Sequence, residues 1–149
     1  ATAPPLFAAL PVCGVAAPAD LHNAREAAEA AAAKSERYVF SAQDGVTAVT
    51  LYAKAQVCFA QAQHAADAQR MARERESLAQ RIDEDYKTHR LRLERALRLG
   101  RFDDAAAEAR ALRALTRHLT GPYVDWLTLL DRRLQLLVDA ANLRAAAAK

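Results

Sequence analysis

Residues 82–119 read IDEDYKTHRLRLERALRLGRFDDAAAEARALRALTRHL, and this stretch decides the fold. Apolar residues recur at every third or fourth position on both sides of Gly100, a spacing typical of amphipathic helices. Gly100 stands where a helix end needs a residue with a positive φ angle. Asp103 or Asp104 is predicted to cap the second helix. Because the connection is so short, the two helices are expected to form an antiparallel hairpin.

The turn of this hairpin resembles a tetratricopeptide (TPR) motif. Gly100, Phe102 and Ala105 give the pattern G-x-[FY]-x-x-A. In that family the glycine closes the first helix, the aromatic ring packs under the turn and the alanine allows close contact between helices. The resemblance implies the same roles for these three residues. It covers roughly residues 86–117, about one repeat, and Arg117 stands at the usual proline. We therefore expect a TPR-like hairpin rather than a TPR array.

The composition favours long helices. Of the 149 residues, 52% are hydrophobic but only 6% are aromatic, and alanine, the strongest helix former, supplies much of the apolar content. With only 4 glycines and 5 prolines, a sheet of short strands is not expected. The predicted fold is all-α, with about five helices in antiparallel hairpins forming a TPR-like helical bundle. Residues 20–149 are predicted to be a single helical domain, preceded by an extended apolar arm over residues 1–19.

Local signals predict how the first helix begins and ends. Asn23, followed three residues later by Glu26, resembles a capping box, so the helix is expected to begin at Asp20 or Asn23. The bulky residues at its end are expected to dock it into the core. They are Tyr38, Val39 and Phe40.

The next helix is predicted to begin at Ser41 with Asp44, and Gly45 in its first turn is expected to be ordinary helix. Residues 46–99 then contain no glycine or proline. This segment is either one very long helix or two helices that meet at an unmarked turn. We favour a break or kink within residues 59–77, because a globular chain of this size seldom keeps a helix of more than about fifty residues.

The arm, ATAPPLFAALPVCGVAAPA, is uncharged and apolar and admits three interpretations. It is the mature N-terminal segment of an exported protein, the end of an uncleaved signal sequence with Ala17-Pro18-Ala19 as the cleavage site, or a lipoprotein signal around Cys13. We favour the first, because no basic segment precedes the apolar one. No segment of the chain has the long apolar run that a membrane-spanning helix requires.

Cys13 and Cys58 are the only cysteines. In an exported protein such a pair often forms a disulfide, which here would fasten the arm to a helix. In a cytoplasmic protein the two residues would instead be buried, unreactive thiols. The disulfide is therefore tied to the localisation of the protein.

No catalytic, cofactor or metal site is predicted. The histidines lie far apart, at positions 22, 64, 89 and 118, and residues 83–85 point in different directions on a helix, so they cannot act as a carboxylate pair. The densest basic run, residues 90–101, spreads over two helix faces and lacks aromatic residues that could stack on bases. The chain is therefore not expected to be an enzyme or to bind nucleic acid.

Thr120-Gly121-Pro122 separates the last helix from the one before it. The last helix carries the strongest apolar stripe, which we take as the candidate interface with a protein partner or a second copy of the chain. Its residues are Tyr123, Trp126, Leu127, Leu130, Leu134 and Leu137.

The function expected from these features is non-catalytic: an adaptor, scaffold or structural subunit of a bacterial cell-envelope assembly, located in the periplasm or otherwise exported. Helical hairpins often form extended protein-binding surfaces. Arginine greatly outnumbers lysine and alanine is abundant, which we attribute to a GC-rich bacterial genome. The alternative is a cytoplasmic regulatory or nucleic-acid-associated helical protein.

Overall fold

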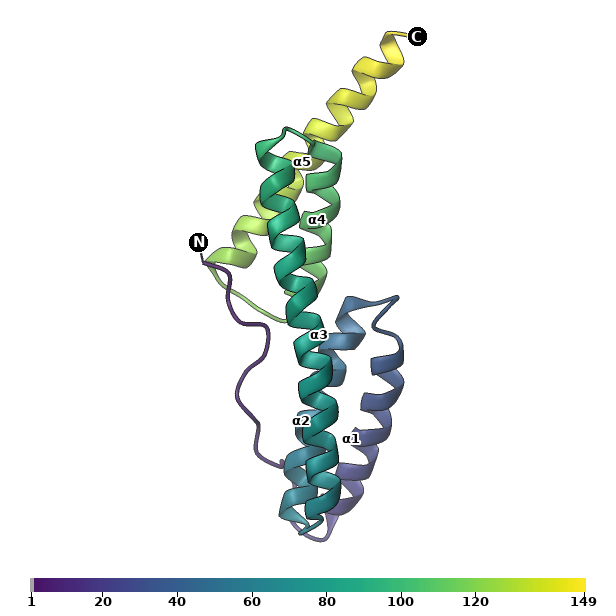
Figure 1. Ribbon diagram of the computed structural model, residues 1–149, viewed down its shortest axis with the longest axis vertical. Coiled ribbons are helices and arrows are strands. Elements are labelled where there is room, and N and C mark those ends of the chain that lie inside the picture. Colours follow the sequence, from purple (N-terminus) through teal and green to yellow (C-terminus); the bar gives the residue numbers. More distant parts are fainter. Residues whose placement is uncertain (1) are drawn as a thin grey trace. The chain divides into compact units, whose positions relative to one another are not determined.

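The computed structural model describes residues 2–149, which fold into five α-helices joined by short connections (Figure 1). The helices are α1 (Ala19–Glu36), α2 (Ala42–Gln61), α3 (Ala65–Arg98), α4 (Phe102–Leu115) and α5 (Pro122–Ala147). The predicted all-α class with about five helices is confirmed. The predicted break within residues 59–77 is also confirmed, because α2 ends at Gln61 and α3 begins at Ala65.

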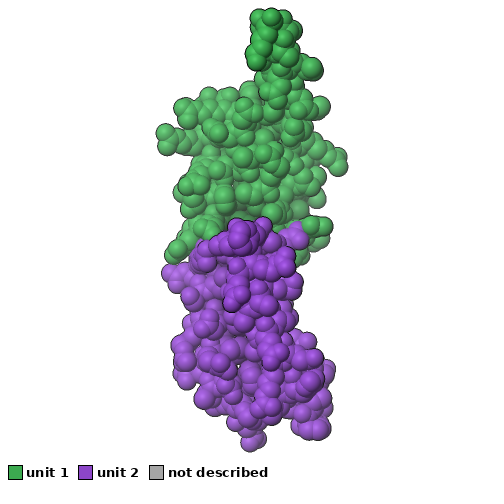
Figure 2. Space-filling view, turned by 90° about the vertical axis from the view of Figure 1, so that its right-hand side faces the viewer, with its two compact units in different colours: residues 1–6, 84–149 green, residues 7–83 purple. Residues whose placement is uncertain are grey.

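The chain forms two compact units, coloured separately in Figure 2. Unit 2 comprises residues 7–83, and unit 1 comprises residues 1–6 together with 84–149. These units differ from the predicted division into an arm over residues 1–19 and one domain over residues 20–149. The reason is that the chain passes between the units twice, once in the arm after Leu6 and once within α3.

Unit 2 is built on the hairpin of α1 and α2. α1 buries Ala24, Ala27 and Ala31, which recur every three or four positions along the face that packs on α2. Such small side chains let two helix axes approach closely. Larger side chains from α2 and α3 supply most of the remaining buried apolar surface. They are Val46, Val49, Tyr52, Phe59, Met71, Leu78 and Ile82.

The start of α2 follows the sequence signal. Ser41 is the N-cap residue, and its hydroxyl accepts a hydrogen bond from the backbone N–H of Asp44 at 3.2 Å. The Asp44 carboxylate also forms salt bridges with Lys34, whose Nζ lies at 3.1 Å, and with Arg37, whose Nε lies at 2.9 Å. The hydrogen bond from Lys34 and the two positive charges hold the pKa of Asp44 below its usual value. These contacts fasten the end of α1 to the beginning of α2.

The predicted caps of α1 and α4 were wrong. α1 begins at Ala19, so Asn23 lies inside the helix and forms no capping box. α4 begins at Phe102 with Arg101 at the N-cap position, and no side chain caps it. Asp103 and Asp104 lie in its first turn instead, where negative charge is favourable near the helix N-terminus.

Gly45 lies within α2 and has no positive φ angle, so it is ordinary helix as expected. A methyl group there would nevertheless lie 2.1 Å from Cδ1 of Tyr38, because the buried ring closes the position. The end of α1 differs from expectation. Tyr38 is buried as predicted, but Val39 and Phe40 are 64% and 90% exposed. The prediction that they dock into the core was wrong because α1 ends at Glu36, and only Tyr38 of the following turn faces inward.

The break between α2 and α3 is a Schellman motif without glycine. Gln63 has a φ of 62°, its N–H donates to Ala60 O at 3.1 Å, and the N–H of His64 donates to Phe59 O at 2.9 Å. The rings of Phe59 and His64 lie 6.3 Å apart, which supplies the side-chain contact common in this motif. Gln63 therefore occupies a left-handed conformation that normally favours glycine.

Replacing Gln63 by glycine should raise the free energy of unfolding by about 1 kcal/mol, because the left-handed strain disappears. The side chain of Gln63 is exposed, so little packing is lost. Thermal or urea unfolding followed by circular dichroism measures the change. Gln69→Gly, at an exposed position inside α3, is the control and should lower stability by about 0.5–1 kcal/mol. If both variants lose stability, Gln63 is not the strained residue of the turn.

Unit 1 contains the hairpin predicted around Gly100. Gly100 has a φ of 66°, its N–H donates to Leu97 O at 3.2 Å, and the N–H of Arg101 donates to Ala96 O at 2.9 Å. This is the same Schellman motif as at Gln63, here with the expected glycine. Gly121, with a φ of 128°, and Pro122 at the start of α5 also follow the prediction.

An N-terminal segment of the chain also packs into the core of unit 1. Leu6 is buried, and its carbonyl oxygen accepts a hydrogen bond from His118 Nε2 at 2.6 Å. The hydroxyl of Tyr86 donates to the carbonyl oxygen of Pro4 at 3.2 Å. The remaining core side chains come from α3, α4 and α5 and include Leu93, Leu112, Leu115, Leu127 and Leu134.

Candidate interaction surfaces

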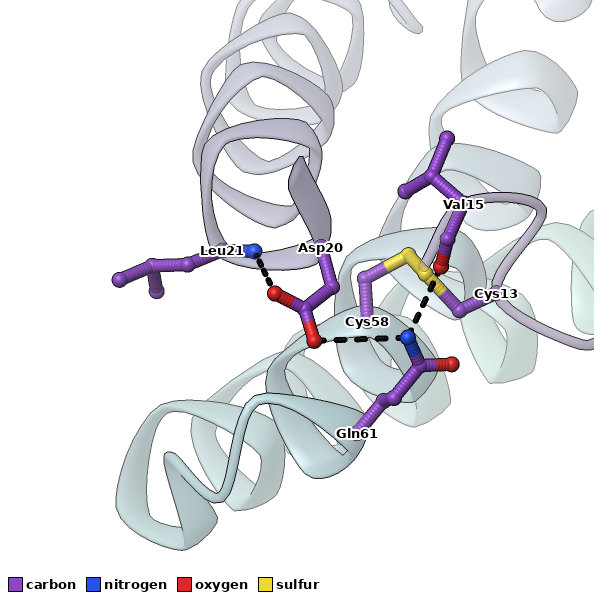
Figure 3. Close-up of a disulfide and its surroundings, with 6 residues drawn as sticks. All are labelled: Cys13, Val15, Asp20, Leu21, Cys58 and Gln61. Atoms are coloured by element: carbon purple, nitrogen blue, oxygen red, sulfur yellow. Dashed lines mark hydrogen bonds between the residues drawn. A yellow bond between two sulfur atoms is a disulfide. The ribbon is translucent and has the colours of Figure 1, made fainter. Parts of the chain in front are cut away.

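Cys13 and Cys58 are joined by a disulfide in unit 2, with their Cα atoms 4.9 Å apart (Figure 3). Cys58 lies in α2 and is fully buried, whereas Cys13 belongs to the arm. Of the two states that the sequence left open, the structure contains the oxidised one. The bond closes a loop across a sequence separation of 45 residues.

Polar contacts continue the attachment of the arm beyond the disulfide. Gln61, at the end of α2, donates through Nε2 to the carbonyl oxygen of Val15 at 2.8 Å and to Asp20 Oδ2 at 3.4 Å (Figure 3). The other carboxylate oxygen of Asp20 accepts the backbone N–H of Leu21 at 2.8 Å. The buried Asp20 carboxylate is thereby satisfied, and residues 13–20 are fastened to the end of α2.

The predicted interface on α5 is divided between the core and the surface. Tyr123, Leu127 and Leu134 are buried inside unit 1 and are not accessible to a partner. Burial raises the pKa of Tyr123 to about 12, so its phenol is neutral at ordinary pH. Trp126 and Leu137 are partly exposed, and Leu130 is intermediate.

A second apolar stripe of α5 faces solvent, and of its residues only Trp126 belongs to the interface predicted from the sequence. Leu129, Leu136 and Leu143 are 64%, 71% and 72% exposed, and Trp126 lies on the same side of the helix. We name these four residues the outer stripe. The three leucines are spaced by seven residues, the signal that identifies it. Sequence alone presents two apolar stripes on one helix without showing which of them packs against α4.

α5 also extends past the helices that cover its other face. Figure 1 shows its last turns continuing beyond the turn between α3 and α4. Every residue from 141 to 149 is exposed. The outer stripe continues onto this end of the helix through Leu143, so apolar surface reaches a segment that is solvated on all sides.

The turn residues named by the TPR resemblance have different environments. Gly100 closes α3, and Ala105 is fully buried, as the resemblance implies. Phe102 is 40% exposed, so it doesn't pack under the turn as the ring of a TPR motif does. No TPR repeat is identified in the described part of the chain.

The basic run contributes to a groove of about 400 Å³ at the end of the α3–α4 hairpin. Arg92, Arg95 and Arg101 line it together with Asp104 and Glu108. Acidic side chains thus stand among the arginines, and Glu108 additionally pairs with His89 on α3. The mixture leaves little continuous positive surface of the kind that a phosphate backbone requires.

A larger groove of about 520 Å³ lies in unit 2. Its apolar lining includes Tyr52, Phe59 and Met71, and charged side chains from α1 and α3 stand beside them. Burial, with the charge of Glu74 nearby, raises the pKa of Tyr52, so its hydroxyl is neutral. The charged side chains are of both signs: Arg25, Glu29, Arg70 and Glu74.

Within residues 2–149, no group of three or more His, Cys, Asp and Glu side chains gathers in a way that could hold a metal ion. None of the described helices is long and apolar enough to cross a membrane. No protein-family model, curated protein or solved structure matches the chain.

Proposed function

We propose that this protein is a non-catalytic protein–protein interaction subunit of a bacterial cell-envelope assembly and acts in the periplasm. The observation that carries the proposal is the outer stripe, in which four large apolar side chains of one helix face solvent. Large exposed apolar patches on soluble proteins usually mark interaction sites. Tryptophan, present once in the chain at Trp126, is enriched among the residues that dominate binding energy at interfaces.

The disulfide supports the proposed location in the periplasm. Disulfides persist in oxidising environments such as the bacterial periplasm, and cytoplasmic thiols are kept reduced. Here the bond fastens the arm to α2, so an oxidising compartment stabilises the architecture of unit 2. The alternative is a cytoplasmic regulatory or nucleic-acid-associated protein. Its nucleic-acid role has weaker support, because carboxylates interrupt the arginine groove.

A photo-crosslinking amino acid placed at Leu136 of the full chain tests the proposal in bacterial cells that express it. Leu91, a similarly exposed leucine on α3, provides the matched control position. We expect a discrete adduct from position 136 and none from position 91, in a periplasmic fraction where both cysteines resist thiol labelling. Mass spectrometry of the adduct identifies the partner. Absence of any adduct from position 136, or reduced cysteines in the native compartment, would contradict the proposal.

A further inference from the structure

We propose that the outer stripe of α5 pairs with the outer stripe of a second copy of the chain, and that the two helices run antiparallel. This inference rests on the proposed function, because it names the partner of the same surface. The result would be an isologous dimer, in which one patch serves both subunits.

The spacing of the stripe fits a two-stranded coiled-coil seam. Trp126, Leu129, Leu136 and Leu143 fall on a 3-4 repeat that Arg133 and Ala140 complete. A repeat that averages 3.5 residues keeps such a seam against a partner helix. From position 126 to position 143 the seam is about 26 Å long at 1.5 Å per residue. That length is several turns of continuous helix–helix contact.

One antiparallel register uses the whole seam. With Trp126 opposite Leu143 of the second copy, Leu129 lies opposite Ala140 and Arg133 lies opposite Leu136. Every seam position is then paired, and large side chains are set against smaller or flexible ones. A parallel pair would place Arg133 against Arg133 in the middle of the seam, where two like charges repel. In the antiparallel arrangement each Arg133 instead faces Leu136, so the two arginines are offset by three residues, about 4.5 Å along the helices, and their stems lie on leucine.

The edges of the seam are complementary in the same register. On one edge, Arg132 comes beside Asp139 of the second copy, and symmetry makes this pair twice. On the other edge, Leu130 comes beside Leu137. Arg132 and Asp139 are exposed, and at two turns apart on their own helix they do not face each other as an i,i+4 pair would. Each can therefore pair with the opposite charge of a second copy. On the exposed surface of its own helix, Asp139 accepts a hydrogen bond from Gln135 Nε2 at 3.0 Å.

The projecting end of α5 supplies a further reason. Residues 141–149 are exposed, and short helical segments are marginal in water without tertiary packing. In the antiparallel pair, Leu143 lies against the N-terminal half of α5 of the second copy, which carries the buried residues Tyr123 and Leu127. Each subunit would thus cover the unsupported turns of the other.

The first test measures self-association of the full, disulfide-intact chain by sedimentation equilibrium between about 1 and about 200 µM. We expect a dimer, with the emission of Trp126 shifting to shorter wavelength as it forms. Leu136→Glu should raise the dissociation constant at least ~100-fold. Leu91→Glu, the exposed control on α3, should leave it unchanged. A wild-type chain that is monomeric throughout this range overturns the proposal.

The second test fixes the register. Arg132→Asp and Asp139→Arg should each weaken the dimer about 10-fold, and the two changes in one chain should restore it to within ~3-fold. Both positions are exposed, so circular dichroism should show unchanged helix content. A double variant no tighter than the single ones overturns the antiparallel pairing.

The two proposals fail in different ways. A monomeric chain that still gives an adduct from position 136 to another protein overturns the second copy as partner but leaves the interaction function standing. A dimer whose only adduct in cells is the second copy supports both.

Discussion

Replacing Cys13 and Cys58 together by alanine should lower the free energy of unfolding by about 4 kcal/mol. The disulfide spans 45 residues, and the loss of chain entropy on closing a loop of that length in the unfolded state accounts for this value at 25 °C. Cys58 is fully buried, so alanine is preferable to serine, which would leave a hydroxyl without water. With a denaturant slope of about 2 kcal/mol per molar urea, the midpoint should fall by about 2 M.

Urea unfolding followed by circular dichroism, with and without a reducing agent, measures this effect. Reduction should destabilise the wild-type chain by a similar amount and leave the double alanine variant unchanged. That variant is therefore the control for side effects of the reductant. A loss below about 1 kcal/mol would show that the disulfide contributes little beyond the polar contacts around it.

Gly45→Ala should destabilise unit 2 by up to about 3 kcal/mol, the upper range for overpacking a closed site. The added methyl group would lie 2.1 Å from Cδ1 of Tyr38 and 2.8 Å from Cγ. The ring cannot move away freely, because it is buried and the guanidinium of Arg81 lies 5.0 Å from its centre on one face. Either the ring leaves its site or the start of α2 shifts.

Thermal unfolding of four variants tests this explanation: Gly45→Ala, Gly14→Ala, Tyr38→Ala and the Tyr38→Ala, Gly45→Ala double variant. Gly14→Ala is the control, since a methyl group there meets nothing within 4 Å, and its stability should change little. In a Tyr38→Ala background, the cost of Gly45→Ala should largely disappear, because the clashing ring is gone. An equal cost in both backgrounds would assign the effect to the helix backbone instead.

The sequence predicted features that depend on local chemistry. Ser41 caps α2, Gly100 closes α3 and Gly121 with Pro122 begins α5, because each signal acts within a few residues of itself. The turn at Gln63 was located only to within a segment, since no propensity marks a glutamine in a left-handed conformation. The role of Gly45 was missed because it depends on the ring of Tyr38.

The candidate surface was predicted only in part, for a related reason. α5 has two apolar stripes, and the buried one, with Leu127 and Leu134, was included in the predicted interface. The period of a helix shows that a face is apolar, but not which element packs on it. Which of the two stripes is buried depends on tertiary contacts with α4, so the interface predicted from the sequence omitted the exposed residues Leu129 and Leu136.

The place of Leu6 in unit 1 has a consequence for biosynthesis. Its carbonyl oxygen is bonded to a residue that lies 112 positions later in the chain. At about 5–20 residues per second, the ribosome delivers His118 roughly 6–22 s after Leu6. All of residues 7–83, including both cysteines, is synthesised in that interval. The apolar residues around Leu6 are therefore among the last to reach their native contacts, and they remain available to chaperones until His118 has been made.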